Sequence, residues 1–493
     1  MAEPDVLFLF LLSVSFTLTG RSSATTRVVS SPSICVIGGG IGGSSLAYFL
    51  KSYSSDQNIS SIRIFEKSGV VGGRMATVEV AGDKFEAGAS VIHPKNMHAI
   101  RFAQLLNLKK KTRKDDASSI GIWNGQKFIF KTVSLPPNSR FGKIISFLNS
   151  LLVLKRYRWS LFRMHRFVER TVHCFLKYYQ QLEARPVFET VEEMLQWAGL
   201  HSLTQRTLQE ELAEAGLSQR LISELVTVIT RINYGQDVSI SALAGTVSLA
   251  GSDSGLWSVE GGNWMLAAGL INHSNASLNL GEEILSVARI GRMYELKSTR
   301  GSSYSCEVVV AATPLDELNI SFSPPISVPQ RKLMHTYTTF VRGLLNHGYF
   351  GLNSHKEIPD LVGTIEDLNL PFSSIGVQKT YSIDDKVYKV FSRSAIPEEL
   401  LDQMFSRRQE TIRLNWAAYP HFMAPEVFAP FMLDGLHLYY VNAFENAAST
   451  IETSAVAAEN VARLILKRLS SGTPTDVHYI GMSVSEYGHK FDL

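Results

Sequence analysis

The chain has 493 residues, of which 45% are apolar and 19% charged, a balance typical of globular proteins. This length suffices for two or three domains. The formal net charge of only +3 gives no support for a nucleic-acid partner, but it leaves small-molecule ligands and membranes open.

Residues 1–24 are predicted to form a signal peptide. The apolar run Val6 to Leu18 is shorter than the roughly 20 residues that span a bilayer, and small polar residues around Ser22 follow it. Glu3 and Asp5 depart from the usual basic start, and the alternative is a buried N-terminal strand. Asn-x-Ser sequons fit a glycoprotein of the secretory pathway. They begin at Asn58, Asn272, Asn275 and Asn319.

A buried strand, a glycine-rich turn and an amphipathic helix are predicted over residues 33–50. Gly38, Gly40 and Gly43 match the pattern GxGxxG. The first glycine permits a tight turn, the second lets the backbone approach a pyrophosphate, and the third lets helix and strand pack closely. The helix N-terminus then offers N–H groups to the phosphates. Because glycine-rich loops are common, the pattern alone is weak evidence.

A second strand, Ile62 to Glu66, follows at the distance expected of a βαβ unit. Glu66 is expected to accept a hydrogen bond from a ribose 2′-hydroxyl. Its carboxylate would repel a 2′-phosphate, which favours FAD or NAD over NADP. The alternative for Glu66 is a solvated acid at a strand end.

A second glycine-rich turn, Gly69 to Thr77, favours FAD over NAD because a nicotinamide-only domain does not need it. Within this turn, Gly73 and Arg74 are expected to meet the pyrophosphate, for which a guanidinium fork is well suited. An acid-ended second strand that leads into a GGR turn resembles the flavin amine-oxidase superfamily. Glu86 to Ser90 resembles the segment of those enzymes that passes the flavin ring.

The middle of the chain is predicted to be partly helical. Ile144 to Tyr178 is apolar, aromatic and basic. It is interpreted either as a core helix with a basic solvent side, the simpler reading, or as a helix that docks on an anionic membrane face. Glu192 to Val228 is predicted to form paired helices over the flavin, with a break at Gly216.

Two later segments are predicted to complete the cofactor site. Val287 is expected to meet the adenine through its backbone. The strand-like residues 438–445 include Asn442, and a helix follows with Thr450 as its cap and Glu452 in its first turn. That helix N-terminus would point at the flavin pyrimidine; the alternative is an ordinary amphipathic helix. We expect Val287, Asn442 and Glu452 to contact the cofactor.

The predicted fold is α/β, or α+β overall, with a Rossmann-like FAD-binding domain assembled discontinuously and a partly helical substrate domain. After the signal peptide, the FAD-binding parts are residues 25–110, 241–320 and 426–493, and the substrate parts are 111–240 and 321–425. The cysteines are scattered, two of them in apolar strand-like runs, which predicts buried thiols and neither a disulfide framework nor a metal site. They are Cys35, Cys174 and Cys306.

Four further motifs resemble the prenylcysteine oxidases, also called farnesylcysteine lyases. These motifs are Gly88 to Pro94, Asn233 to Gln236, Ser252 to Asn263 and Ala418 to His421. The resemblance covers nearly the whole chain after the signal peptide. It implies FAD-dependent oxidation of S-farnesyl- or S-geranylgeranyl-cysteine by O₂, which gives a prenyl aldehyde, cysteine and hydrogen peroxide. It also implies a lysosome or vacuole, with an extracellular site as the alternative, and no obligate protein partner is inferred.

The chemistry that this resemblance implies needs no strong base, because loss of hydride from the allylic carbon leaves a cation shared with sulfur. Water then adds, and a positioned histidine could assist the proton transfers. The candidates are His93 and His421, with Tyr419 as an aromatic wall and Glu260 near the ring edge. A histidine beside proline is also commonly structural. The rival functions are another flavin amine or polyene oxidase, and a non-catalytic secreted protein that binds FAD or lipid.

Overall fold

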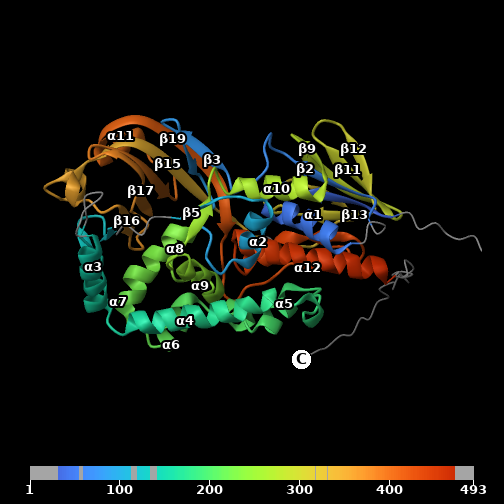
Figure 1. The fold of residues 1–493 in the computed structure, drawn as a ribbon, viewed down its shortest axis with the longest axis horizontal. Helices are drawn as coiled ribbons and strands as arrows, with labels where there is room; N and C mark the ends of the chain where they lie inside the picture. Colours follow the sequence, from blue (N-terminus) through green and yellow to red (C-terminus); the bar gives the residue numbers. More distant parts are fainter. Residues whose placement is uncertain are drawn as a thin grey trace, which may run out of the picture.

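The computed structural model describes residues 31–54, 59–112, 119–133, 142–316, 318–329 and 331–471. The predicted signal peptide and the Asn58 sequon lie outside these residues. Figure 1 shows an elongated molecule with a large curved sheet at one end, the nucleotide-binding sheets at the other, and helices along one long side. The mixed α/β fold with a Rossmann-like domain is as predicted.

A five-stranded parallel sheet forms the centre of the nucleotide-binding domain, in the order β20-β13-β1-β2-β9. Its middle strands are apolar and buried on both faces, as parallel strands usually are. α1, α10 and α12 pack together on one face. The strands are β1 (Ser33–Ile37), β2 (Ser61–Glu66), β9 (Ser277–Leu280), β13 (Val308–Ala311) and β20 (Leu438–Tyr440), and the helices are α1 (Ile41–Tyr53), α2 (Met97–Leu105), α10 (Trp264–Ser274) and α12 (Ile451–Ser470).

A four-stranded sheet covers the other face, in the order β12-β11-β10-β14. Its strands are β10 (Ile284–Ile290), β11 (Met293–Ser298), β12 (Ser303–Cys306) and β14 (Ser321–Ser323). The strands of the nucleotide-binding domain therefore come from three separate stretches of the chain, as a discontinuous assembly requires.

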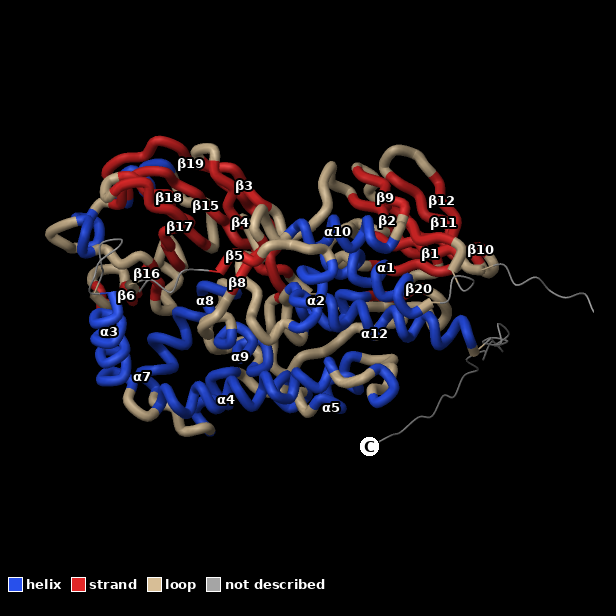
Figure 2. The backbone as a smooth tube through the Cα atoms, in the orientation of Figure 1, coloured by secondary structure: helices blue, strands red, loops and turns tan. Residues whose placement is uncertain are grey.

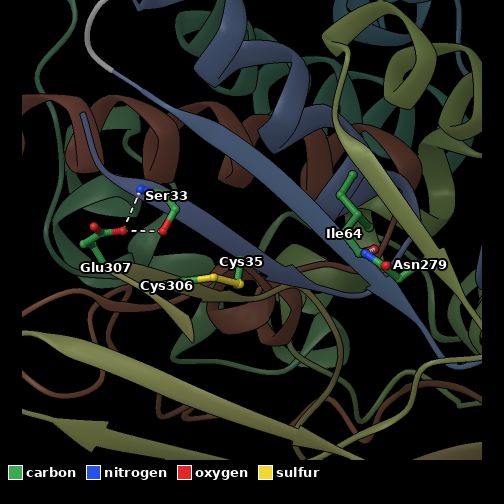
Figure 3. The surroundings of a disulfide bond; sticks show 6 residues. All are labelled: Ser33, Cys35, Ile64, Asn279, Cys306 and Glu307. Atoms are coloured by element: carbon green, nitrogen blue, oxygen red, sulfur yellow. Dashed lines mark hydrogen bonds between the residues drawn. A yellow bond between two sulfur atoms is a disulfide. The ribbon is translucent and has the colours of Figure 1, made fainter. Parts of the chain in front are cut away.

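A disulfide joins Cys35 in β1 to Cys306 at the end of β12, with a Cα–Cα distance of 6.0 Å (Figure 3). The prediction of three buried thiols is therefore wrong for these two residues, and only Cys174 is a free thiol. The two bridged cysteines are 271 residues apart in sequence. They meet because the two sheets pack face to face, which scattered positions in apolar runs do not reveal.

The second domain contains a curved seven-stranded sheet in the order β19-β15-β18-β17-β16-β6-β7. Its strands are β6 (Ile120–Trp123), β7 (Phe128–Lys131), β15 (Leu333–Leu345), β16 (Leu361–Thr364), β17 (Ser374–Ser382), β18 (Asp385–Ser392) and β19 (Phe405–Pro420). Two short ribbons connect it to the rest of the molecule, and α11 (Glu398–Met404) precedes β19. These ribbons are β3 (Thr77–Val80) with β4 (Asp83–Glu86), and β5 (Lys110–Thr112) with β8 (Trp257–Val259).

A layer of helices faces this sheet and continues under the nucleotide-binding domain (Figure 2). It contains α3 (Gly142–Tyr157), α4 (Ser160–Phe175), α5 (Val191–Ala198), α6 (Leu208–Glu214), α7 (Gln219–Leu221), α8 (Thr227–Tyr234) and α9 (Ala242–Ala250). The predicted break at Gly216 is present, with a φ of 75° between α6 and α7.

The helical layer crosses the predicted domain boundaries in two places. α9, which a boundary at residue 241 assigns to the FAD-binding part, packs on α4, α6 and α8. α5, within the predicted substrate part 111–240, packs in the same hydrophobic core as α12. α5 and α9 cross the predicted boundaries because the partners of a helix are set by tertiary contacts, whereas the predicted boundaries follow local sequence motifs.

Candidate active site

The first glycine turn has the steric features that its motif predicts. Gly38 has a φ of 116° and its N–H donates to the carbonyl of Phe65 at 2.8 Å. A Cβ at Gly43 would lie 2.0 Å from the carbonyl oxygen of Gly38, so α1 approaches β1 as closely as the third glycine allows. These two glycines are therefore required by the fold itself.

Gly40 differs, because a Cβ there would be 3.9 Å from its nearest neighbours in the second glycine turn, Gly72 and Gly73. The N–H of Gly72 donates to the carbonyl of Gly39 at 3.1 Å, and Gly73 has a φ of 54°. Among the described residues, no side chain caps the N-terminus of α1. The two turns thus form an open cradle of backbone N–H groups and a helix N-terminus, which suits a diphosphate.

Glu66 is buried and lies beneath this cradle. One carboxylate oxygen accepts from the N–H of Gly39 at 2.8 Å, and the other accepts from the N–H of Ser68 at 2.9 Å. The alternative of a solvated strand-end acid is therefore wrong. Val287 lies in β10, buried between the two sheets; its expected backbone contact with adenine stays a prediction.

Arg74 forms an ion pair with Glu445, a residue that the sequence interpretation did not single out. Arg74 also donates to the carbonyl of Ala418 at 2.8 Å. Glu445 is buried and accepts from Asn442 Nδ2 and Ser449 Oγ, each at 2.8 Å. Burial alone would raise the pKa of Glu445, but the charge of Arg74 and these hydrogen bonds hold it below the ordinary value.

This cluster leaves polar groups open to a ligand bound in the cradle. The Oδ1 atom of Asn442 is buried and has no partner within the described part of the chain, so it remains an acceptor for a hydroxyl group. Arg74 is partly exposed, which leaves part of its guanidinium open to a ligand. The strand expected over residues 438–445 ends at Tyr440, and Glu445 lies in the 3-10 helix Val441–Asn446 that follows it.

The N-terminus of α12 is capped as predicted, since Thr450 and Thr453 form a reciprocal capping box. Glu452, in the first turn of this helix, lines the cavity described below and is hydrogen-bonded within the chain. It accepts from the N–H groups of His98 and Ala99, at 2.7 and 3.0 Å, and from Tyr179 Oη at 2.6 Å. Glu452 therefore stabilises the start of α2, and its expected contact with the cofactor stays a prediction.

A cavity of about 860 Å³ lies between the helical layer, the seven-stranded sheet and the N-terminus of α12. This volume is within the range of small-molecule sites. Much of its wall is apolar and comes from α4, α8, α9 and the turn before α8, with Val172, Phe175, Leu225, Ile229, Leu243 and Val247 among the lining residues.

Two of the four predicted catalytic residues line this cavity. Tyr419 packs edge-on against Tyr234, with ring centroids 4.9 Å apart. Burial raises the pKa of Tyr419 to about 12, against the opposing charge of Arg74, so its hydroxyl stays protonated at neutral pH. His93 lines the cavity with its Nε2 atom 3.2 Å from Asp253 Oδ2.

The other two predicted catalytic residues do not line this cavity, and their catalytic roles stay predictions. His421 is exposed beyond the end of β19; burial of part of its ring and the charge of Lys332 lower its pKa. Glu260 is also exposed, after β8, with its N–H donating to the carbonyl of Lys109 at 2.9 Å. Neither lines the cavity. Each was chosen for its place in a motif, which does not fix the direction of a side chain.

Lys389 is a cavity residue that the sequence interpretation missed. It is only 5% exposed, and its Nζ donates to the carbonyl of Glu86 at 2.9 Å and to Ser90 Oγ at 3.1 Å. It also lies 4.6 Å from the ring centroid of Phe391. The pKa of Glu86 is raised to about 7 by burial, against the N–H of Asn263 and the charge of Lys389. The available sequence signal for Lys389 was a lysine between the apolar residues Tyr388 and Val390 of β18.

Two solved oxidases share this architecture at low sequence identity. Wild-type putrescine oxidase aligns with a TM-score of 0.56 and 13% identity, over 89% of this chain and 99% of that one. Cyclohexylamine oxidase from Brevibacterium oxydans aligns with a TM-score of 0.57 and 17% identity, over 89% and 100%. The fold is therefore that of the flavin amine oxidases.

Sequence comparison identifies the family within this class. The family model for prenylcysteine lyase matches residues 142–476, and that for an NAD(P)-binding Rossmann-like domain matches residues 36–106. Farnesylcysteine lyase of Arabidopsis thaliana is 56% identical over 469 residues, which are 94% of each chain. Prenylcysteine oxidase 1 of Homo sapiens is 34% identical over 474 residues, covering 89% of this chain and 90% of that one. The chain belongs to the prenylcysteine lyase family.

Proposed function

We propose that this protein is an FAD-dependent thioether oxidase that converts S-prenyl-L-cysteine, O₂ and water into a prenyl aldehyde, cysteine and hydrogen peroxide. One observation carries the proposal: the apolar cavity adjoins the cofactor cradle. Tyr419 lines the cavity, while the preceding carbonyl, of Ala418, accepts from Arg74 in the cradle. The names of the Arabidopsis and human relatives support this substrate class.

The choice of FAD rests on the paired glycine turns and on the Arg74, Asn442 and Glu445 cluster. A ligand with only one nucleotide would need the first glycine turn and Glu66. The Arg74, Asn442 and Glu445 cluster lies beyond these two features, on the side toward the cavity. When bound, FAD would accept two electrons from the substrate and pass them to O₂. The residues of this chain would hold it through backbone N–H groups, one guanidinium and one buried amide oxygen.

The cavity wall would hold the prenyl group by apolar burial, at about 0.8 kcal/mol per buried CH₂. The reacting carbon is allylic and bonded to sulfur, so the chain has to supply little base strength. Its tasks are to align the substrate, to limit the access of water, and to move the proton of the water that adds to the oxidised substrate.

His93 is the residue best placed to assist the transfer of that proton. The N–H of Lys95 donates to His93 Nδ1 at 3.0 Å, so Nδ1 is an acceptor and the proton of the neutral ring sits on Nε2. Nε2 then donates to Asp253, at the cavity wall. This arrangement would hold the ring in one tautomer, and His93 would assist by positioning the carboxylate of Asp253, which would take up the proton of the adding water.

We place the protein in the secretory pathway, with a lysosome or vacuole as its destination and the cell exterior as the alternative. The Cys35–Cys306 bridge supports an oxidising compartment during folding. The asparagines of the three sequons within the described residues, Asn272, Asn275 and Asn319, are exposed and accessible to glycosylation. Expression in a eukaryotic host, followed by glycosidase treatment and a mobility assay, tests this placement.

The absorption spectrum of the purified protein, followed by anaerobic titration with farnesylcysteine, tests the activity. We expect a flavin spectrum that is bleached by about one equivalent of substrate, and hydrogen peroxide when air is readmitted. Benzylamine and putrescine serve as controls for an amine oxidase. Bleaching by an amine but not by farnesylcysteine would overturn the substrate class, and a protein that binds no flavin would overturn the whole proposal.

A further inference from the structure

Two consecutive helices, α3 and α4, present large apolar side chains to solvent. Trp159 is 76% exposed, Phe147 63% and Phe162 53%, and the rings of Trp159 and Phe162 lie 5.5 Å apart. Isolated exposed apolar residues are common, but a contiguous group marks an interaction surface. The group, called here the α3–α4 apolar face, consists of Phe147, Leu148, Leu151, Leu152, Leu154, Trp159 and Phe162.

Helical geometry makes this face continuous. On α3, the exposed residues recur at spacings of three and four, which places them side by side along one stripe. Trp159 and Phe162 follow it after the turn at Arg158, at the start of α4, where their rings contact each other. α3 lies at the end of the molecule far from the five-stranded sheet (Figure 1), so no element of the nucleotide-binding domain covers it.

The charges of these two helices are mostly basic. Residues 142–175 contain seven lysines and arginines and a single acid, Glu169. Lys155, Arg158, Arg163 and Arg166 are all exposed, alongside the apolar residues. Such a combination of an apolar stripe with basic flanks is typical of helices that lie in the interface of an anionic membrane.

The same two helices form part of the cavity wall from their opposite side. Val153 of α3 and Met164, Thr171 and Val172 of α4 line the cavity. Val153 lies between the exposed Leu152 and Leu154, and Met164 lies two residues after the exposed Phe162. One helical layer therefore separates the apolar face from the cavity. Within the described residues, no helix is both long enough and apolar enough to cross a bilayer, so a membrane contact here would be peripheral.

We propose that the α3–α4 apolar face docks on the surface of a bilayer that contains anionic lipids, and that docking brings the cavity close to its lipid-derived substrate. The second clause rests on the proposed function, whereas docking itself does not. A second copy of this chain fits the face less well, because a symmetric contact would bring together two surfaces that each carry seven basic residues and one acid, Glu169, within residues 142–175.

Co-sedimentation of the full-length flavoprotein with vesicles tests this proposal. Vesicles of phosphatidylcholine are compared with vesicles that also contain phosphatidylserine, at low and high salt. We expect binding to the anionic vesicles that weakens with salt. The double substitution Trp159→Ala and Phe162→Ala is expected to weaken it by roughly tenfold or more. Substitution of Leu368, which is 86% exposed, by alanine is the matched control and should leave binding unchanged.

Three readouts separate this proposal from its alternatives. Equal binding of the Trp159 and Phe162 variant and the wild type would overturn it. A wild-type dimer in solution that the double substitution converts to a monomer would assign the face to a second copy and also overturn it. The flavin spectrum and the turnover of farnesylcysteine in solution should be unchanged in the variant. If the wild-type protein does not turn over farnesylcysteine, the proposed function is refuted, but the result of the vesicle-binding assay still holds.

Discussion

Substitution of Gly40 by alanine should separate flavin binding from folding. The new Cβ would lie 3.9 Å from the nearest atoms of the chain, and a φ of −79° suits any residue. The flavin-free protein should therefore keep its stability or gain about 0.4–1 kcal/mol. The methyl group would instead occupy the space of the diphosphate. Overpacking costs about 1–3 kcal/mol, which corresponds to roughly 5- to 140-fold weaker FAD binding.

Gly43→Ala is the matched comparison. Its Cβ would lie 2.0 Å from the carbonyl oxygen of Gly38 and 3.2 Å from Val36 Cγ1. Because backbone cannot yield as a side chain can, we expect a loss of about 3 kcal/mol or more of stability with or without flavin. Thermal unfolding of the flavin-free proteins and fluorescence titration with FAD measure both effects. Wild-type FAD affinity in Gly40→Ala would refute the placement of the diphosphate over this turn.

Three further outcomes are expected. Glu445→Gln breaks a buried ion pair and should cost about 3–5 kcal/mol. Because the folded pKa of Glu445 lies below its unfolded value, its stabilisation is present above the unfolded pKa and lost as pH falls through the folded one, so melting curves against pH should show less acid sensitivity in the variant. His93→Gln should lower turnover by roughly 100-fold without altering the flavin spectrum; unchanged turnover would make His93 structural. Val247→Phe narrows the cavity and should reduce kcat/KM for geranylgeranylcysteine more than for farnesylcysteine. An equal reduction for both substrates would show that α9 does not line the prenyl site.

The features of the fold that could be predicted from sequence are those set by neighbouring residues. Gly38 and Gly43 have the steric roles that their spacing indicated, and Thr450 caps its helix because a capping hydroxyl acts over three residues. Glu66 is likewise where a βαβ unit places it. In each case the signal and the structure lie within one turn, strand or helix end.

The features that were missed depend on contacts between distant segments. Cys35 and Cys306 meet only when two sheets stack, and Glu445 meets Arg74 across 371 residues. Glu260 belongs to a recognisable motif, yet it is exposed after β8 and does not line the cavity, which membership of a motif does not reveal. Lys389 could not be identified from sequence because the role of a buried lysine depends on the groups that surround it in the fold, and sequence spacing does not show these groups.

The bridge between Cys35 and Cys306 fastens the strand that leads into the phosphate cradle to the sheet behind it. A disulfide that closes so long a loop typically adds about 2–4 kcal/mol of stability. Protein produced in a reducing cytosol would lack this disulfide in β1, the strand next to Gly38. Poor flavin retention by such a preparation would then reflect the redox history of the sample, whatever the quality of the cofactor site in the protein as the cell makes it.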